Sequence, residues 1–180
     1  QRNNLRYCET INSTNPCGEQ PLPPYGACLL GSVNLARLVR NSFTADAALD
    51  LDALRNLVTT AVRMLDNAID ISRFPLPEQE NEARAKRRIG LGITGLADAL
   101  IFCRARYGSD QAVALTHTWL AEVRRAAYLA SVDLAKEKGA FPLFERKAFP
   151  ASDGNVKLDD DVRTAIAKHG IRNALLTSIA

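Results

Sequence analysis

The five residues Asn15-Pro16-Cys17-Gly18-Glu19 place an amide, a thiol and a carboxylate within one short segment. Side chains at alternate positions of an extended chain point to the same side, so Asn15, Cys17 and Glu19 are predicted to share one face. Pro16 favours an extended conformation at the residue before it, and Gly18 lets a ligand approach the backbone closely. The amide could orient a substrate hydroxyl, the carboxylate could accept a proton, and the thiol could perform nucleophilic or radical chemistry.

A purely structural interpretation of the same residues is open as well. Asn-Pro pairs commonly begin turns, and a single cysteine in a loop is often only packed. The chain has no Cys-x-x-Cys pair and its two histidines are remote from the cysteines, so neither a structural zinc site nor a disulfide scaffold is expected. Two of the cysteines are expected to be passive, Cys103 as a core residue and Cys8 less clearly so because it lies close to the motif.

The elements that must position the motif can be predicted from composition and periodicity. Residues 12–26 hold four prolines and two glycines, which predicts an extended loop. Residues 27–39 contain short apolar pieces that could be buried strands, although period alone does not separate strand from helix there. The later pattern predicts an amphipathic helix over 51–71, further helices over 96–103, 110–138 and 160–168, and a strand over 175–180.

Residues 90–95 fit the pattern Gly-x-Gly-x-x-Gly, but the segment before them, Ala-Arg-Ala-Lys-Arg-Arg, is unsuited to the buried strand that a dinucleotide fold needs. We therefore predict a tight turn leading into the helix at 96–103. The basic cluster of Arg84, Lys86, Arg87 and Arg88 is predicted to form a solvated surface turn. His117 and His169 are expected to be structural, and Trp119 to anchor the third helix in the core.

The overall composition describes one ordinary globular domain. The 180 residues are 47% hydrophobic and 24% charged, and the net charge of +3 is too small to predict a DNA, RNA or membrane partner. No apolar run approaches 18 residues, and no signal peptide is recognisable, so a cytoplasmic location is expected. The chain lacks an initiator Met, which suggests that it begins inside a larger protein.

The run from Asn15 to Leu35, NPCGEQPLPPYGACLLGSVNL, resembles the active-site loop of ribonucleotide reductase large subunits. The compact spacing between Cys17 and Cys28 is most similar to that of the adenosylcobalamin-dependent class II enzymes. The segments NNLRYCETINST, RRIGLGITGLADAL and RNALLTSIA resemble the same family, so the resemblance spans essentially the whole chain.

This resemblance implies an α/β fold in which residues 1–180 are a helix-rich fragment of a ten-stranded α/β barrel, with residues 12–28 as the central finger loop. It implies reduction of ribonucleotides to 2′-deoxyribonucleotides by a thiyl radical on Cys17, with Glu19 as base on the 3′ hydroxyl and Asn15 bonded to the substrate. Pro16 and Gly18 would complete the substrate-binding segment. Cys28 matches one member of the redox pair, and its partner would lie outside the chain.

The resemblance further implies adenosylcobalamin as cofactor, bound mainly by regions outside this chain, and no metal ligands within it. It implies a nucleotide effector and a thioredoxin-type reductant, and it allows a homodimer of the full-length protein. The fragment alone is expected to be inactive. Two alternatives remain open: a class I large subunit whose radical comes from a separate small subunit, and a non-catalytic nucleotide-binding relative.

Overall fold

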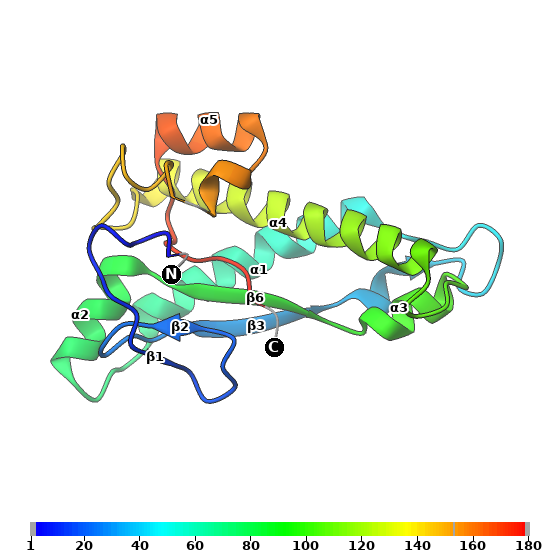
Figure 1. Ribbon diagram of the computed structural model, residues 1–180, viewed down its shortest axis with the longest axis horizontal. Coiled ribbons are helices and arrows are strands. Elements are labelled where there is room, and N and C mark those ends of the chain that lie inside the picture. The colour runs from blue at the N-terminus through cyan, green and yellow to red at the C-terminus, as the bar shows by residue number, and fades with distance from the viewer. Residues whose placement is uncertain (1–2, 153, 179–180) are drawn as a thin grey trace.

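The computed structural model describes residues 3–152 and 154–178. The chain combines helices and short strands (Figure 1), so the mixed α/β class predicted from the sequence is correct, while closure into a ten-stranded barrel stays a prediction. The elements are β1 (Ser13–Thr14), β2 (Pro21–Leu22), β3 (Leu29–Asn34), the 3-10 helix η1 (Leu35–Leu38), β4 (Val39–Arg40), β5 (Ala48–Leu49), α1 (Leu51–Ile71), α2 (Pro77–Lys86), β6 (Ile89–Thr94), α3 (Leu96–Phe102), α4 (Asp110–Lys138), the 3-10 helix η2 (Asn155–Lys157) and α5 (Asp160–His169).

The central sheet is parallel. Strand β3 pairs with β6 in a register that runs from Leu29 opposite Ile89 to Asn34 opposite Thr94. On the other edge of β6, the segment 175–178 runs parallel to it through a bridge between Leu91 and Thr177. The strand predicted over 175–180 is thus reduced to one bridge among the described residues, and its last two residues lie outside them.

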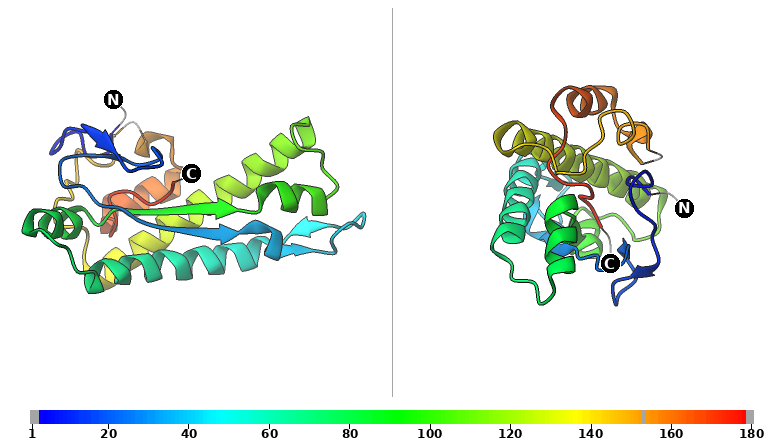
Figure 2. Two further views of the ribbon diagram at one scale, coloured as in Figure 1. Left: turned by 90° about the horizontal axis from the view of Figure 1, so that it is seen from below. Right: turned by 90° about the vertical axis from the view of Figure 1, so that its left-hand side faces the viewer.

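The predicted helices are present, and α1 shows why. Asp50 caps its N-terminus by accepting a hydrogen bond from the backbone of Ala53 at 3.0 Å. Apolar side chains recur every three or four residues and are buried, namely Leu54, Val58, Val62, Leu65 and Ile69. This face packs on β3 and β6, and α4 lies along α1 (Figures 1 and 2). Trp119 is 3% exposed on α4, which confirms it as a core anchor.

The glycine-rich segment 90–95 is strand β6 rather than the predicted tight turn. Ile89, Leu91 and Ile93 alternate with glycines or threonine, and this period of two is a strand signal that outweighs the flexibility of glycine. Ile89 and Leu91 are buried, whereas Gly90 and Gly92 occupy the opposite face of the strand. Only Gly95, with a φ of 67°, marks the turn into α3.

The prediction of a solvated basic turn at residues 84–88 is wrong for three of its four members. Lys86, Arg87 and Arg88 are at most 4% exposed, while Arg84 remains partly exposed beside Glu80. The helix α2 ends at Arg87, whose φ of 49° turns the chain directly into β6. The three side chains are buried because each one meets carboxylates from distant parts of the sequence.

A buried polar network centred on Asp66 of α1 joins the beginnings of the strands. Arg87 Nε donates to Asp66 Oδ1 at 2.8 Å, and Asn173 Nδ2 donates to the same oxygen at 3.0 Å. Arg172 Nε donates to Asp66 Oδ2 at 3.4 Å. Ser131 of α4 donates to Asn173 Oδ1 at 2.9 Å. The network therefore connects α1, α4, the start of β6 and the start of the segment 175–178.

Within the described ranges, no helix combines the length and the apolar character that crossing a membrane requires.

Replacing Asp66 by alanine should destabilise the fold by about 3–5 kcal/mol, because it leaves the buried guanidinium of Arg87 with fewer partners. Asp52→Ala is the matched control, since its side chain is 88% exposed on the same helix and should change stability by about 0.5 kcal/mol or less. Urea unfolding of both variants measures the difference. Equal effects would show that the Asp66 network does not hold the sheet.

Candidate active site

The motif residues form the tip of a β-hairpin. β1 and β2 pair antiparallel, with Ser13 opposite Leu22, and the chain reverses between them. The N–H of Gly18 donates to the carbonyl of Asn15 at 3.0 Å, and Gly18 has a φ of 81°. The extended alternation predicted for residues 15–19 is therefore wrong, because a chain reversal needs a turn, for which a proline and a left-handed glycine are well suited.

The turn nevertheless brings two of the predicted side chains together. Asn15 Nδ2 donates to Glu19 Oε1 at 2.5 Å, and Asn15 Oδ1 accepts the backbone N–H of Gln20 at 2.9 Å. The amide is thus fixed at both ends. It orients the carboxylate of Glu19 and leaves its second oxygen available.

That second oxygen of Glu19 is buried and has no hydrogen-bond partner among the described residues. It lines a cavity of about 130 Å³ between the hairpin tip and the sheet, together with Ser32, Gly90, Gly92 and Ser178. The hydroxyl of Ser178 is also buried without a partner in the described part of the chain. An unused acceptor and an unused hydroxyl in one cavity suit a polar ligand that carries hydroxyl groups.

Cys17 lies in the turn between these two side chains and is exposed. Across residues 3–152 and 154–178 it forms no hydrogen bond. Its thiol is therefore accessible to a ligand at the hairpin tip. The structure therefore joins Asn15 to Glu19 directly, and it keeps Cys17 beside them through the turn rather than through a side-chain contact.

Cys28 lies immediately before β3 and is half-buried. Burial raises the pKa of its thiol to about 12; the charge of Arg88 acts to lower this pKa and that of Glu19 to raise it. Cys28 is therefore protonated at neutral pH, and it lies within electrostatic reach of the hairpin carboxylate. Cys8 is exposed, and Cys103 packs against the core as predicted.

The glycines of β6 let the hairpin tip approach the sheet. A Cβ atom on Gly90 would lie 2.5 Å from Leu30 Cδ2 and 3.0 Å from Gln20 Nε2. A Cβ atom on Gly92 would lie 2.7 Å from the carbonyl oxygen of Ser178. This role was not predicted from the sequence, although the alternation of isoleucine and leucine with glycine in residues 89–93 could have indicated a strand with one face free of side chains.

A buried ion cluster lies behind the site, at the start of β6. Glu9 accepts hydrogen bonds from Asn3 at 2.9 Å and from Arg88, and it pairs with Lys86 at 2.8 Å. Arg88 also pairs with Glu82 at 3.1 Å. Burial acts to raise the pKa of Glu9, but the hydrogen bonds and charges of Arg88 and Lys86 outweigh it, and the pKa lies below its ordinary value.

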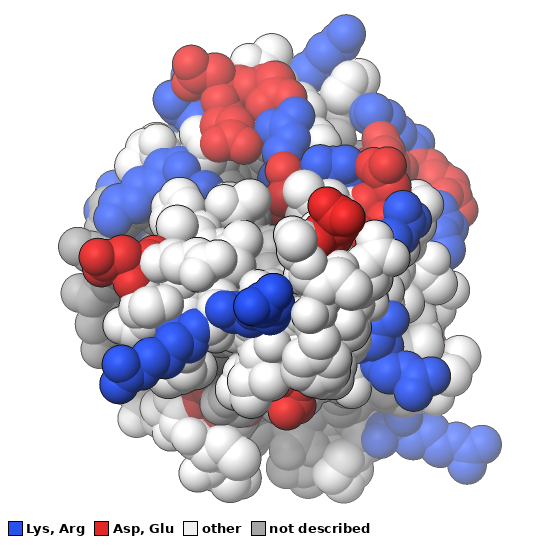
Figure 3. Space-filling view, turned by 90° about the vertical axis from the view of Figure 1, so that its right-hand side faces the viewer, with Lys and Arg blue, Asp and Glu red and all other residues white. Residues whose placement is uncertain are grey.

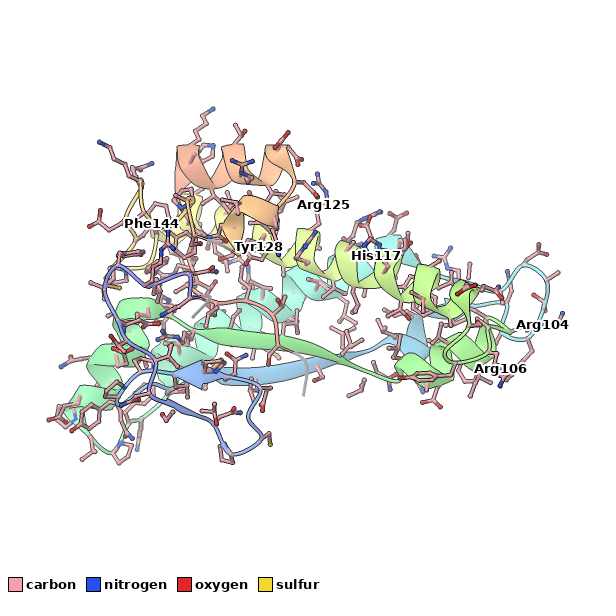
Figure 4. The ribbon with its side chains drawn as sticks, in the orientation of Figure 1. Arg104, Arg106, His117, Arg125, Tyr128 and Phe144 are labelled. Atoms are coloured by element: carbon pink, nitrogen blue, oxygen red, sulfur yellow. The ribbon has the colours of Figure 1, made fainter. Side chains whose placement is uncertain are left out.

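A larger cavity of about 340 Å³ lies on the other side of β6, against α4, and is lined by His117 and Arg124. His117 is exposed on α4 (Figure 4), and neither it nor Arg124 lines the cavity at Glu19. The described residues contain no group of three or more side chains suited to hold a metal ion. Basic and acidic side chains are interspersed on the face shown in Figure 3, which forms no continuous basic surface.

The fold and site define an α/β protein in which parallel strands carry helices on one face and a thiol-bearing hairpin on the other (Figure 2). Residues 1–180 match the family described as "Ribonucleotide reductase, barrel domain". The chain belongs to this family.

Named relatives come from two groups. The vitamin B12-dependent ribonucleoside-diphosphate reductase of Mycobacterium tuberculosis (strain CDC 1551 / Oshkosh) is 47% identical over 79% of this chain and 20% of the relative. The enzyme of the same name from Thermoplasma acidophilum is 36% identical over 94% of this chain and 21% of the relative. The ribonucleoside-diphosphate reductase large chain of Neurospora crassa is 32% identical over 98% of this chain and 20% of the relative. The chain thus spans about a fifth of the length of these curated relatives.

Gly90→Ala should destabilise the protein by about 1–3 kcal/mol, because the added methyl group forces Leu30 and the hairpin tip away from β6. Gly31→Ala is the control on the paired strand. Its Cβ would make an ordinary contact of 3.4 Å with Leu65, so a small effect is expected. Chemical unfolding compares the two, and an unaffected Gly90→Ala variant would mean that the tip does not rest on the strand.

The free energy of unfolding should decrease as the pH is lowered through the range in which Glu9 titrates. Its folded pKa is lowered, so its stabilising contribution is complete above the unfolded pKa, about 4.3, and is lost as the pH falls through the lower folded value. Glu9→Gln should remove this part of the acid dependence, whereas Glu78→Gln, at an exposed position on α2, should leave it unchanged. Unfolding free energies measured across this range test the assignment.

Proposed function

We propose that this chain is the active-site part of a vitamin B12-dependent ribonucleotide reductase, which reduces ribonucleotides to 2′-deoxyribonucleotides. The observation that carries the proposal is the hairpin tip, where the Asn15 amide fixes the Glu19 carboxylate beside the exposed Cys17. The family match over residues 1–180 and the two relatives named as vitamin B12-dependent support it.

In this mechanism Cys17 carries the thiyl radical and takes the 3′ hydrogen atom of the ribose. The unpartnered oxygen of Glu19 accepts the proton of the 3′ hydroxyl, and Asn15 holds that carboxylate and bonds to the substrate. The backbone at Pro16 and Gly18 completes the substrate-binding segment. The 2′ hydroxyl then leaves as water, and the hydrogen atom returns from Cys17 to the 3′ carbon.

Replacement of the 2′ hydroxyl by hydrogen, with release of water, consumes two electrons and two protons. We assign one of the two thiols that supply them to Cys28, because it lies beside the site and within electrostatic reach of Glu19. Oxidation joins Cys28 to a second cysteine outside this chain, and a dithiol reductant of the thioredoxin type reduces that disulfide again. Nucleotide effectors and a homodimer remain predictions for the whole protein.

The proposed setting is the ten-stranded barrel, with the β1–β2 hairpin as its central finger loop. The hairpin face of the sheet suits this setting, because Leu30 is 47% exposed and Cys17 is uncovered in this part of the protein. Further strands from the rest of the polypeptide would enclose both. Exclusion of water would protect a radical and strengthen the polar contacts to the substrate.

The residues of this chain suit a site that receives a radical from adenosylcobalamin, and they do not form a pocket that could hold the cofactor. The cavity at Glu19 is far too small for a corrin ring, whereas the exposed sulfur of Cys17 is accessible to a cofactor held by other regions. When bound, the cofactor supplies the radical through which the Cys17 thiol loses its hydrogen atom. A class I large subunit would use the same hairpin residues, as the Neurospora relative allows.

Full-length protein assayed with ribonucleotide and dithiol should form deoxyribonucleotide only when adenosylcobalamin is added. Cys17→Ser should abolish turnover. Glu19→Gln should lower the rate by about 10²–10⁴-fold.

Cys103→Ser is the matched control, since its sulfur packs against the core outside the site. Turnover that needs a second metal-containing subunit instead of the cofactor would favour the class I alternative. A Cys17→Ser protein that still reduces ribonucleotides would favour a non-catalytic role for the hairpin.

A further inference from the structure

Arg88 and Cys28 are neighbours across the parallel ladder. The pairing of β3 with β6 begins at Leu29 opposite Ile89, so the two preceding residues, Cys28 and Arg88, lie side by side at the start of both strands. The N–H of Leu29 donates to the carbonyl oxygen of Arg88 at 3.4 Å, which fixes this backbone register. Residues at equivalent positions of paired parallel strands present their side chains to the same face.

The guanidinium of Arg88 is not fully used by its ion pairs. Arg88 is 2% exposed and binds Glu9 and Glu82 through its terminal nitrogens. Its Nε–H is buried and has no hydrogen-bond partner within the described residues. A buried donor without a partner is costly, so a fold that keeps one is expected to use it in another state of the protein.

Two charged groups act on the Cys28 sulfur, Arg88 and Glu19, and they act in opposite directions. Burial acts most strongly and keeps the thiol neutral. Lys86 belongs to the same ion cluster as Arg88 but is not among the groups that act on Cys28. Of the cations in this cluster, Arg88 is the one whose charge acts to lower the pKa of Cys28.

We propose that Arg88 is a positioning residue for the thiol of Cys28, where its buried guanidinium stabilises the negative charge on the sulfur during thiol–disulfide exchange. The inference rests on the proposed role of Cys28 as a redox thiol. A thiolate of the reducing protein attacks the second cysteine of the disulfide, that S–S bond breaks, and Cys28 leaves as a thiolate beside Arg88. The second thiol of the reductant then attacks the reductant's own sulfur in the mixed disulfide, which forms the reductant disulfide and releases the second cysteine as a thiolate. Cys28 and the second cysteine each take up a proton that the two reductant thiols have lost.

The test is the site-resolved alkylation rate of Cys28 in the reduced full-length protein, measured with iodoacetamide from about pH 7 to about pH 10 and read by mass spectrometry. The thiolate is the reacting form, so the rate reports the stabilisation of the charged sulfur. Arg88→Gln should slow alkylation of Cys28 by about tenfold and shift its pH profile upward. Arg88→Lys, which keeps the charge, should recover most of the rate.

Lys86→Met is the matched control, because it removes a cation from the same carboxylates without acting on Cys28. It should leave the alkylation of Cys28 unchanged. Cys8 serves as a positive control, since the charges of Lys86 and Arg88 both act to lower its pKa and both substitutions should slow its reaction. Thermal unfolding of each variant shows whether the fold is retained.

If Arg88→Gln does not fold, the variant Glu82→Gln provides a second test, in which the alkylation rate of Cys28 should change in the opposite direction. It removes a carboxylate that pairs with Arg88 at 3.1 Å, so alkylation of Cys28 should become faster. Unchanged alkylation of Cys28 in both variants, or an equal slowing in Lys86→Met, would overturn the inference. The proposed function is judged separately: Cys28→Ser with full dithiol-dependent turnover would remove the redox role and leave the measured effect of Arg88 intact.

Discussion

The carboxylate of Asp66 is fully buried, and a charge taken out of water costs several kcal/mol unless partners surround it. Its partners come from Arg87, Arg172 and Asn173, which lie just before β6 and just before the segment 175–178. The network therefore aligns the starts of these strands on α1. The register of β3 against β6 is carried by the parallel ladder itself, which begins at Leu29 opposite Ile89 and so fixes the place of Cys28 just before it.

A second constraint comes from the division of the sheet into two faces. Isoleucine and leucine of β6 pack against the helices. Its glycines carry no side chain on the other face, so Gln20 at the hairpin tip can lie against Gly90. The helices support one face of the sheet, and the absence of side chains at Gly90 and Gly92 lets neighbouring segments approach the other face closely. The side chain of Gln20 rests against Gly90, the Asn15 amide is bonded to Glu19, and the second carboxylate oxygen of Glu19 is left to face a ligand.

The charges near the site form two linked groups with different tasks. Asp66 and Arg87 hold the sheet together, whereas Glu9, Lys86 and Arg88 lie behind the cysteine that precedes β3. Lys86 is the last residue of α2 and Arg87 takes the left-handed conformation, so within this turn Arg87 reaches Asp66 whereas Lys86 and Arg88 both reach Glu9. A short basic run thereby serves stability on one side of the sheet and the thiol on the other.

Periodicity, capping and motif spacing are local properties, so the sequence was sufficient to predict the mixed α/β class, the helices other than α2, and the candidate residues Asn15, Cys17, Glu19 and Cys28. Helix α2 was not predicted, because its polar sequence carries no apolar stripe. Only the tertiary structure decided that the motif is a turn, that residues 89–94 are a strand and that the basic run is buried. The reason is physical: Arg88 meets Glu9 across 79 positions and Arg87 meets Asp66 across 21. Burial of a charge depends on such distant partners, which no local pattern contains.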